Sequence, residues 1–325
     1  MPSLKEVKRR INSIRSTQKI TSAMQMVSSA KLHRAQTALG NMLPYEERLH
    51  FILSAFVHEQ AYLLTHSKPG TFHPLRQSPF AMERPVQHVA IVVVASDTGL
   101  CGAYNANMAK FLNTVLEEYA HLPKENILLY PVGKKMVDAA AKTGCAVSHQ
   151  FEDLDGKPEY IPCASLSRRL GISFLRGNLD KVELLYYHFK NMAVQQIKRE
   201  QFLPFPIANI TDENPSFGRE LRGKQGVIIP KAYTMLAKEN EFSDYIIEPS
   251  RQQFLDELLP KVMRFRLFRA MLDANASEHA ARTMAMKTAT ENADDLLADL
   301  TVLYNKSRQQ AITNELLDIA GGSVQ

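Results

Sequence analysis

Residues 261–320 read KVMRFRLFRAMLDANASEHAARTMAMKTATENADDLLADLTVLYNKSRQQAITNELLDIA. Between Pro260 and Gly321 nothing breaks a helix, because glycine and proline are absent, so this segment predicts one continuous helix of about 60 residues. At 1.5 Å per residue such a helix is a rod of roughly 90 Å. No compact domain of this size can bury it. Alanines keep the middle of the rod slim: Ala274, Ala276, Ala280, Ala281, Ala285, Ala289 and Ala293.

The amino-terminal segment predicts a second long helix, since residues 3–39 contain neither glycine nor proline. Its apolar residues recur in steps of three and four, the spacing of a coiled-coil seam: Leu4, Val7, Ile11 and Ile14. The seam then loosens through Thr17, Thr21, Ala23, Met24 and Val27. Gly40 and Pro44 can bend the rod before the helical pattern resumes over residues 45–64. Two such helices can bury their seams only against each other or against a partner, so an antiparallel coiled coil is expected.

The middle of the chain has a different period. VQHVAIVVVA (86–95) is an apolar, β-branched run of the kind that forms a fully buried strand. Strand and helix patterns then alternate, which predicts an α/β, Rossmann-like layer domain. The predicted strands cover residues 86–95, 126–132, 182–189 and 245–247, and the predicted helices cover 105–119, 134–143 and about 165–175. A stretch rich in proline, asparagine and glycine, residues 203–226, is interpreted as an exposed insertion. The chain is thus divided into a coiled-coil helix (1–64), the α/β domain (85–248) and a second coiled-coil helix (250–325).

Composition narrows the class of protein. The 325 residues, 45% hydrophobic and 22% charged, are typical of a soluble chain with one large or two ordinary domains. The longest apolar run, residues 89–95, is far short of the roughly 20 residues that span a bilayer, and no signal-peptide pattern opens the chain. Three cysteines without a C-x-x-C pair and scattered histidines favour neither a disulfide framework nor a metal site.

The net charge of +5 is concentrated near the amino terminus. Residues 5–34 contain eight basic residues and one acidic residue, Glu6. This helix is expected to seek a negatively charged surface. Nucleic acid is disfavoured as its partner, because the charges share the helix with the apolar seam and a base-reading set of side chains is missing.

Glycines after the first strand, Gly99 and Gly102, invite a dinucleotide-binding interpretation. The G-x-G-x-x-G spacing is missing, however, and Gly133 with its two lysines lacks the rest of a P-loop. These glycines are therefore interpreted as tight strand-to-helix turns. Cys101 has no histidine or aspartate near it in any recognisable pattern and is expected to pack in the core. No catalytic, cofactor or metal site is predicted.

Four segments, in order along the chain, resemble the gamma subunits of F-type ATP synthases. TQKITSAMQMV (17–27) is similar to the family's T-Q-K-I-T-x-A-M-x-M-V, and SDTGLCGAYN (96–105) to S-D-R-G-L-C-G-G-Y-N. ASEHAARTMAMK (276–287) and YNKSRQ (304–309) lead into ITNELLD (312–318), close to the signature I-T-x-E-x-x-[DE]-x-x-x-G-A. The sequence departs from these patterns at Ser22, Thr98, Ala103 and Ser323.

The resemblance implies a central rotor stalk without catalytic activity or bound nucleotide. Its terminal helices would turn inside a ring of alpha and beta subunits, and its α/β domain would engage the epsilon subunit and the membrane c-ring. It would be a peripheral protein on the cytoplasmic side of the inner (plasma) membrane. The residues that the resemblance places against the ring are Lys19, Thr21, Met24, Glu278, Arg282, Arg308, Gln309, Thr313 and Glu315. The alternative is a coiled-coil adaptor that carries a degenerate Rossmann-like module, and co-purification with alpha and beta subunits would distinguish the two.

Overall fold

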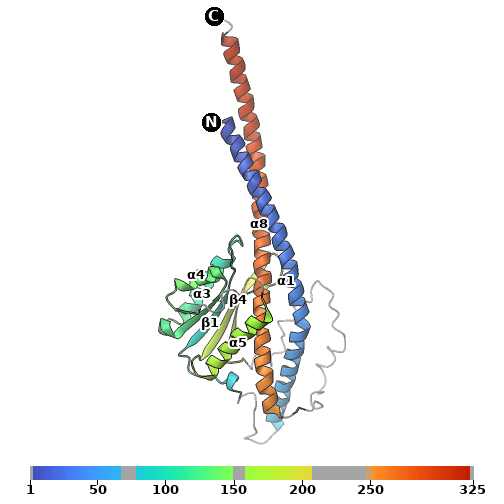
Figure 1. Ribbon diagram of the computed structural model, residues 1–325, viewed down its shortest axis with the longest axis vertical. Helices are drawn as coiled ribbons and strands as arrows, with labels where there is room; N and C mark the ends of the chain where they lie inside the picture. Colours follow the sequence, from blue (N-terminus) through green and yellow to red (C-terminus); the bar gives the residue numbers. More distant parts are fainter. Residues whose placement is uncertain (1–2, 67–77, 149–157, 207–246, 249, 323–325) are drawn as a thin grey trace.

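Two very long helices run antiparallel and project from one side of a sheet domain (Figure 1). They are α1, Leu4–His66, and α8, Arg251–Gly322, with 63 and 72 residues. The computed structural model describes residues 3–66, 78–148, 158–206, 247–248 and 250–322. Both termini lie at the same end of the rod, and α8 continues past the start of α1 (Figure 1). The predicted antiparallel coiled coil is confirmed.

Both helices run through prolines. Helix α1 continues through Gly40 and Pro44, and α8 begins ahead of Pro260. A proline removes one backbone hydrogen bond and so weakens a helix locally. Packing compensates at Pro44, because the flanking Leu39 and Met42 are buried in a cluster with Leu272 of α8. Helix α1 is therefore continuous at Gly40 and Pro44, where the sequence predicts that the rod can bend.

The sheet has five strands in the order β3-β2-β1-β4-β5. The first four are parallel, and β5 pairs antiparallel with β4. The strands are β1 Val89–Val94, β2 Ile127–Val132, β3 Ala146–Val147, β4 Lys181–Phe189 and β5 Gln195–Leu203. The helices of this domain are α3 Tyr104–Glu118, α4 Lys134–Ala141 and α5 Tyr160–Leu175, with short 3₁₀ turns at Pro79–Ala81 and Lys124–Asn126.

Successive residues of β1 enter two different cores, because side chains alternate across a strand. Val89, Ile91 and Val93 pack with α3 and α4 on one face. Ala90, Val92 and Val94 pack with α5 and α8 on the other. The long helix α8 therefore serves as a covering helix of the sheet as well as one half of the coiled coil (Figure 1).

Some predicted elements differ from the structure or lie outside the described residues. The sequence predicts no element over β5, because its polar sequence QQIKREQFL gives a weak strand signal at a sheet edge. Leu203 ends β5 and is buried, so the insertion begins later than predicted. Most of that insertion, and most of the strand predicted at 245–247, lie outside the described residues. Helix α5 begins at Tyr160, five residues before the predicted start.

Candidate functional site: the exposed coiled coil and its junction with the sheet

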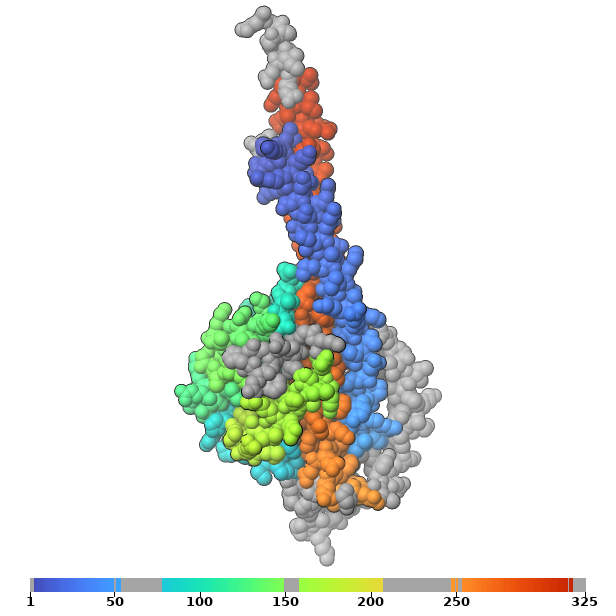
Figure 2. Space-filling view, in the orientation of Figure 1, coloured from blue at the N-terminus to red at the C-terminus, as the bar shows by residue number. Residues whose placement is uncertain are grey.

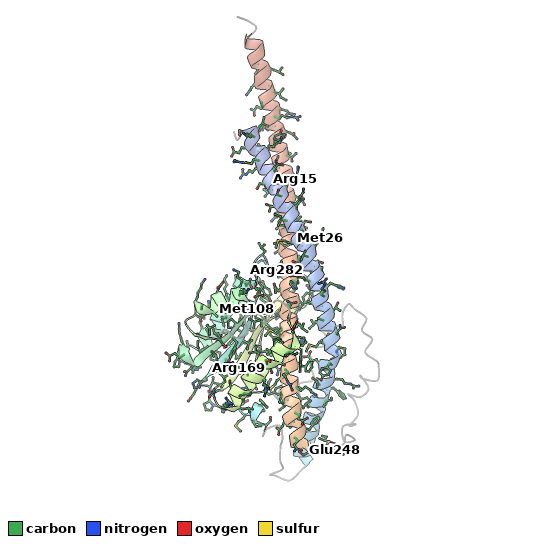
Figure 3. All side chains as sticks on the ribbon, in the orientation of Figure 1. Arg15, Met26, Met108, Arg169, Glu248 and Arg282 are labelled. Atoms are coloured by element: carbon green, nitrogen blue, oxygen red, sulfur yellow. The ribbon has the colours of Figure 1, made fainter. Side chains whose placement is uncertain are left out.

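The nine predicted contact residues fall into three groups along the rod, and Figure 3 labels Arg282, which belongs to the group nearest the sheet. The tip, residues 308–322 of α8, carries Arg308, Gln309 and Thr313, all exposed, and Glu315, whose side chain is not described. The neck, residues 17–28 of α1 with 283–294 of α8, carries Lys19, Thr21 and Met24. The junction, residues 273–282 of α8, carries Glu278 and Arg282. Figure 2 shows the upper part of the coiled coil standing clear of the sheet domain.

Two polar pairs link the helices across the neck, where the apolar side chains of Met286 and Ala293 are buried as well. Thr21 and Thr290 share a hydrogen bond of 2.8 Å between their hydroxyls, and Gln18 donates to Asp294 at 2.5 Å. Lys19 is exposed and Met24 is half-buried. Large apolar side chains next to them face outward, with Met26 70% exposed and Val27 57% exposed. The loosening of the seam that the sequence predicted is confirmed here.

The junction places Glu278 and Arg282 against the chain itself. Both are buried, and Arg282 Nη2 donates to Glu278 Oε1 at 2.5 Å. The same guanidinium reaches the loop after β1, donating to the Thr98 hydroxyl at 2.9 Å and to the Gly99 carbonyl at 3.4 Å. Partner contact by these two residues stays a prediction, because in this chain they hold that loop to α8.

His279 is part of the same cluster. Burial, followed by the nearby Arg282, lowers the pKa of His279 to about 4. The imidazole is therefore neutral at pH 7 and can accept a hydrogen bond at Nδ1, which lies 3.3 Å from Arg282 Nη1. The pair avoids the repulsion of two buried cations.

A Rossmann-type sheet binds its ligand at the carboxyl ends of two neighbouring strands, at the point where the strand order reverses. Helix α8 fills this region. Here those strands are β1 and β4. The Tyr104 hydroxyl, at the start of α3, donates to the Ala274 carbonyl at 3.1 Å. A Cβ added to Gly102 would stand 3.7 Å from the Cβ of Ala285. Helix α8 thus lies against the loop that would have to cradle a phosphate.

Gly133 has a structural reason of its own. Its φ is +93°, and a Cβ there would lie 2.2 Å from the carbonyl oxygen of Ala95. Only glycine fits this turn between β2 and α4. Cys101 is buried, and Asn105 Nδ2 lies 3.3 Å from its sulfur. Both observations agree with the structural roles predicted for the glycine turns and for the cysteine.

The residues that sequence reasoning missed lie on the other side of the junction. Asp273, at 1% exposure, and His188 approach to 2.5 Å between Oδ2 and Nδ1. Asp273 Oδ1 also accepts the backbone N–H of Phe189 at 2.7 Å. The two side chains are 85 positions apart in the sequence, and no local pattern connects them.

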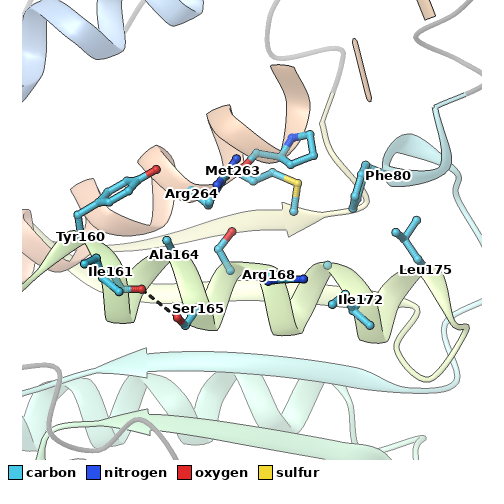
Figure 4. A pocket seen from close by; sticks show the side chains of 13 residues that line it. Phe80, Tyr160, Ile161, Ala164, Ser165, Arg168, Ile172, Leu175, Met263 and Arg264 are labelled. Carbon is cyan, nitrogen blue, oxygen red and sulfur yellow. Dashed lines mark hydrogen bonds between the residues drawn. The ribbon is translucent and has the colours of Figure 1, made fainter. Parts of the chain in front are cut away.

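A separate groove of about 470 Å³ lies between α5 and the first turns of α8 (Figure 4). Phe80, Ile161, Ile172 and Leu175 give it an apolar lining, and Arg168 and Arg264 contribute its charges: the lining residues are Phe80, Tyr160, Ile161, Ala164, Ser165, Ser167, Arg168, Gly171, Ile172, Leu175, Pro260, Met263 and Arg264. None of the nine predicted contact residues is among them.

Within the described part of the chain, no group of three or more histidine, cysteine, aspartate or glutamate side chains could hold a metal ion. None of the described helices has both the length and the apolar character needed to cross a bilayer.

Comparisons with known proteins agree on one family. The family model described as ATP synthase matches residues 3–324. The ATP synthase gamma chain of Phocaeicola vulgatus is 50% identical over 324 residues, covering 100% of both chains, and that of Bacteroides fragilis strain ATCC 25285 is 48% identical with the same coverage. The rotor of the Euglena gracilis mitochondrial ATP synthase is a structural neighbour with a TM-score of 0.54 and 16% identity, covering 95% of this chain and 98% of its own. The central stalk of the Tetrahymena thermophila enzyme gives a TM-score of 0.51 at 19% identity, covering 83% of this chain and 99% of its own. At these identities the two structures support the fold.

Proposed function

The chain belongs to the ATP synthase gamma chain family, and from this membership we infer that it is the central rotor stalk of an F-type ATP synthase. The stalk couples proton-driven rotation of the membrane c-ring to ATP synthesis or hydrolysis on the ring of alpha and beta subunits. It is a non-catalytic subunit, because the chemistry takes place on the beta subunits. Its partners are the alpha/beta ring, the epsilon subunit and the c-ring. No observation favours the alternative of a coiled-coil adaptor.

The observation that carries this function is the exposure of apolar side chains on the part of the rod that extends beyond the sheet domain. Large apolar side chains along the neck and the rest of α8 face outward, where a monomer gains nothing from them. Their exposed fractions are Ile20 59%, Met26 70%, Val27 57%, Leu296 52%, Val302 69%, Ile312 47%, Leu316 61% and Leu317 63%. A helix with apolar positions on several sides requires a surrounding sleeve of protein, which the alpha/beta ring supplies.

We propose that the predicted residues of the tip and neck make the contacts with the ring. Arg308, Gln309, Thr313 and Glu315 would meet it at the tip, and Lys19, Thr21 and Met24 at the neck. Glu278 and Arg282 would act less directly, by holding the loop at Thr98 and Gly99 close to α8. The basic residues of α1 support contact with an acidic surface on the ring.

We assign separate roles to the coiled coil and to the sheet domain. The coiled-coil segments 1–64 and 250–325 form the shaft, and the sheet domain, 85–248, is the foot that engages epsilon and the c-ring. The subunit is peripheral to the membrane, and we place it on the cytoplasmic side of the plasma membrane. The shaft acts by asymmetry: it makes different contacts with each of three equivalent beta subunits, and the difference in contact free energy biases their conformations.

A rotation assay tests this function. The chain is co-expressed with the alpha and beta subunits, the ring is fixed to a surface, and a bead is attached to the foot. We expect the three proteins to co-purify and the bead to turn in one direction when ATP is added. A chain that ends after Leu300, and so lacks the tip, serves as the control and is expected to assemble less well. Failure of the full chain to co-purify with alpha and beta would contradict the rotor function.

A further inference from the structure

Buried polar side chains of α8 join the foot to the shaft, beside the apolar core that α8 shares with the sheet. Asp273 is 1% exposed, and its two carboxylate oxygens bind two successive residues at the end of β4: the side chain of His188 at 2.5 Å and the backbone N–H of Phe189 at 2.7 Å. One turn further along α8, the fully buried Ser277 donates from its hydroxyl to the Tyr187 carbonyl at 3.2 Å. Three consecutive residues of β4 are thus hydrogen-bonded to one face of α8. We call Asp273, Ser277 and residues 187–189 the clamp.

The clamp differs in kind from the apolar contacts between shaft and foot, which include the core that α8 shares with the sheet. Helix α1 meets the end of β4 through an apolar cluster in which Leu32 and Ala35 pack with Phe189. Apolar contact is non-directional, so it resists separation more than it resists sliding. A carboxylate held by two donors at fixed angles is directional and resists rotation as well.

A buried carboxylate that joins two elements costs free energy, because the charge is removed from water. Well-packed apolar residues commonly stabilise a protein as much as a buried charged pair does, so buried charges are better explained by the geometry that they impose. At this junction the geometry to be fixed is the angle between foot and α8. In a rotor that angle must hold while the two ends of the molecule are twisted against each other.

We propose that the clamp is the torque-transmitting joint of this rotor, with Asp273 as a positioning residue that locks α8 to β4. The proposal rests on the rotor function inferred above. Torque applied to the foot enters the shaft through α8, and α1 follows α8 through the coiled coil.

The chain offers a matched control in Asp180. This buried aspartate accepts the backbone N–H groups of Gln87 and His88, both at 2.9 Å, and His88 Nδ1 lies 3.7 Å from it. It therefore has the same chemistry as Asp273, but these partners all belong to the foot. Truncation of either aspartate leaves two donors without their acceptor, yet only one truncation opens the joint.

The test uses the complete ATP synthase reconstituted in vesicles, with Asp273→Ala, Asp273→Asn and Asp180→Ala. ATP hydrolysis and ATP-driven proton pumping are measured on one preparation, and the torsional stiffness of the stalled rotor is taken from the fluctuations of a bead on the foot. Loss of hydrogen bonds to a buried charged group shifts an equilibrium by roughly tenfold or more, here toward a released joint. We expect Asp273→Ala to lower both stiffness and the ratio of pumping to hydrolysis. Asp273→Asn, which keeps an acceptor for Phe189, is expected to be intermediate, and Asp180→Ala to leave both readouts unchanged.

Equal effects of Asp273→Ala and Asp180→Ala would overturn the proposal, because they would mean that any buried lesion loosens the rotor. Unchanged stiffness in Asp273→Ala would overturn it as well. If that variant does not assemble, Ser277→Ala, which removes one hydroxyl, replaces it, and unchanged stiffness there counts against the clamp in the same way. Absence of pumping in the unmodified complex would instead contradict the rotor function.

Discussion

Glu46 makes the stability of the coiled coil depend on pH. This carboxyl lies between α1 and α8 with its side chain 15% exposed, and its Oε1 is 3.3 Å from Arg269 Nη1. Among the described residues, its Oε2 is buried without a hydrogen-bond partner. Burial raises the pKa of Glu46 from 4.5 to about 7, and the opposing effect of Arg269 is smaller. The protein therefore binds a proton at this position more tightly when it is folded than when it is unfolded.

The sign and size of the effect follow from that difference. Stability from a raised pKa is fully present below pH 4.5 and is lost as pH rises through 7, because the unfolded state releases the proton first. One pKa unit corresponds to about 1.4 kcal/mol, so the shift is worth about 3 kcal/mol. Glu46→Gln resembles the protonated form at every pH. We expect its free energy of unfolding to exceed that of the unmodified chain by about 3 kcal/mol at pH 8 but by less than about 1 kcal/mol at pH 5.

The measurement is urea unfolding of the full chain, followed by circular dichroism, at pH 5, 6, 7 and 8. Glu47→Gln is the matched control, because it changes the neighbouring, exposed carboxyl on the same helix. Its difference from the unmodified chain is expected to stay within about 0.5 kcal/mol, as for other surface substitutions. A constant difference between Glu46→Gln and the unmodified chain across the series would refute the reasoning. A less stable Glu46→Gln at pH 8 would show that an ionised pair with Arg269 outweighs burial.

Four further outcomes are expected. The pKa of His279 is about 4 instead of 6.5, so the stability linked to its neutral form is present above pH 6.5 and is lost as pH falls toward 4. In urea unfolding, His279→Gln is therefore expected to reduce the loss of free energy of unfolding between pH 6.5 and pH 4 by up to about 3 kcal/mol. Met24→Lys is expected to leave assembly and ATP binding nearly normal but to impair ATP-driven pumping more than hydrolysis. A new contact made in only one rotary position raises the barrier to leaving that position, and each 1.4 kcal/mol of barrier slows the step about tenfold. Equal losses of pumping and hydrolysis would indicate misassembly. Deletion of residues 313–325 is expected to weaken assembly with alpha and beta while circular dichroism shows a folded foot, and an unfolded chain would contradict the shaft model. Calorimetry with ATP is expected to show no binding to the isolated chain, and micromolar affinity would overturn the assignment of the glycines to turns.

The large elements of the fold could be predicted because their signals are local. Absence of glycine and proline identified α8, steps of three and four identified the start of α1, and a β-branched run identified β1. Strand β5 escaped because it lies at an edge, where polar side chains face solvent and alternation is weak. The continuity of α1 at Pro44 escaped because it depends on packing against α8, which no local rule contains.

The candidate site divides in the same way. Motifs on the tip and neck could be recognised from the sequence, since each lies within one helix. The clamp could not be found, because Asp273 and His188 belong to different elements and aspartate is usually exposed. Glu278 and Arg282 have the i, i+4 spacing of a surface ion pair. Their burial follows only from the passage of α8 over the ends of β1 and β4.

The contacts between α1 and α8 change along the rod. Beside the foot they suit firm transmission of rotation, and at the neck they suit movement past successive partner surfaces. Beside the foot the helices share buried apolar clusters, and α8 is hydrogen-bonded to the sheet, so a twist of the foot must turn the shaft. At the neck the helices share polar pairs such as Thr21 with Thr290, while Met26 and Val27 face outward. A flexible methionine can adapt to successive partner surfaces without a strong preference for one. Substitutions at the neck can therefore alter coupling while the fold is preserved, whereas substitutions at the clamp change how much of the rotation reaches the neck.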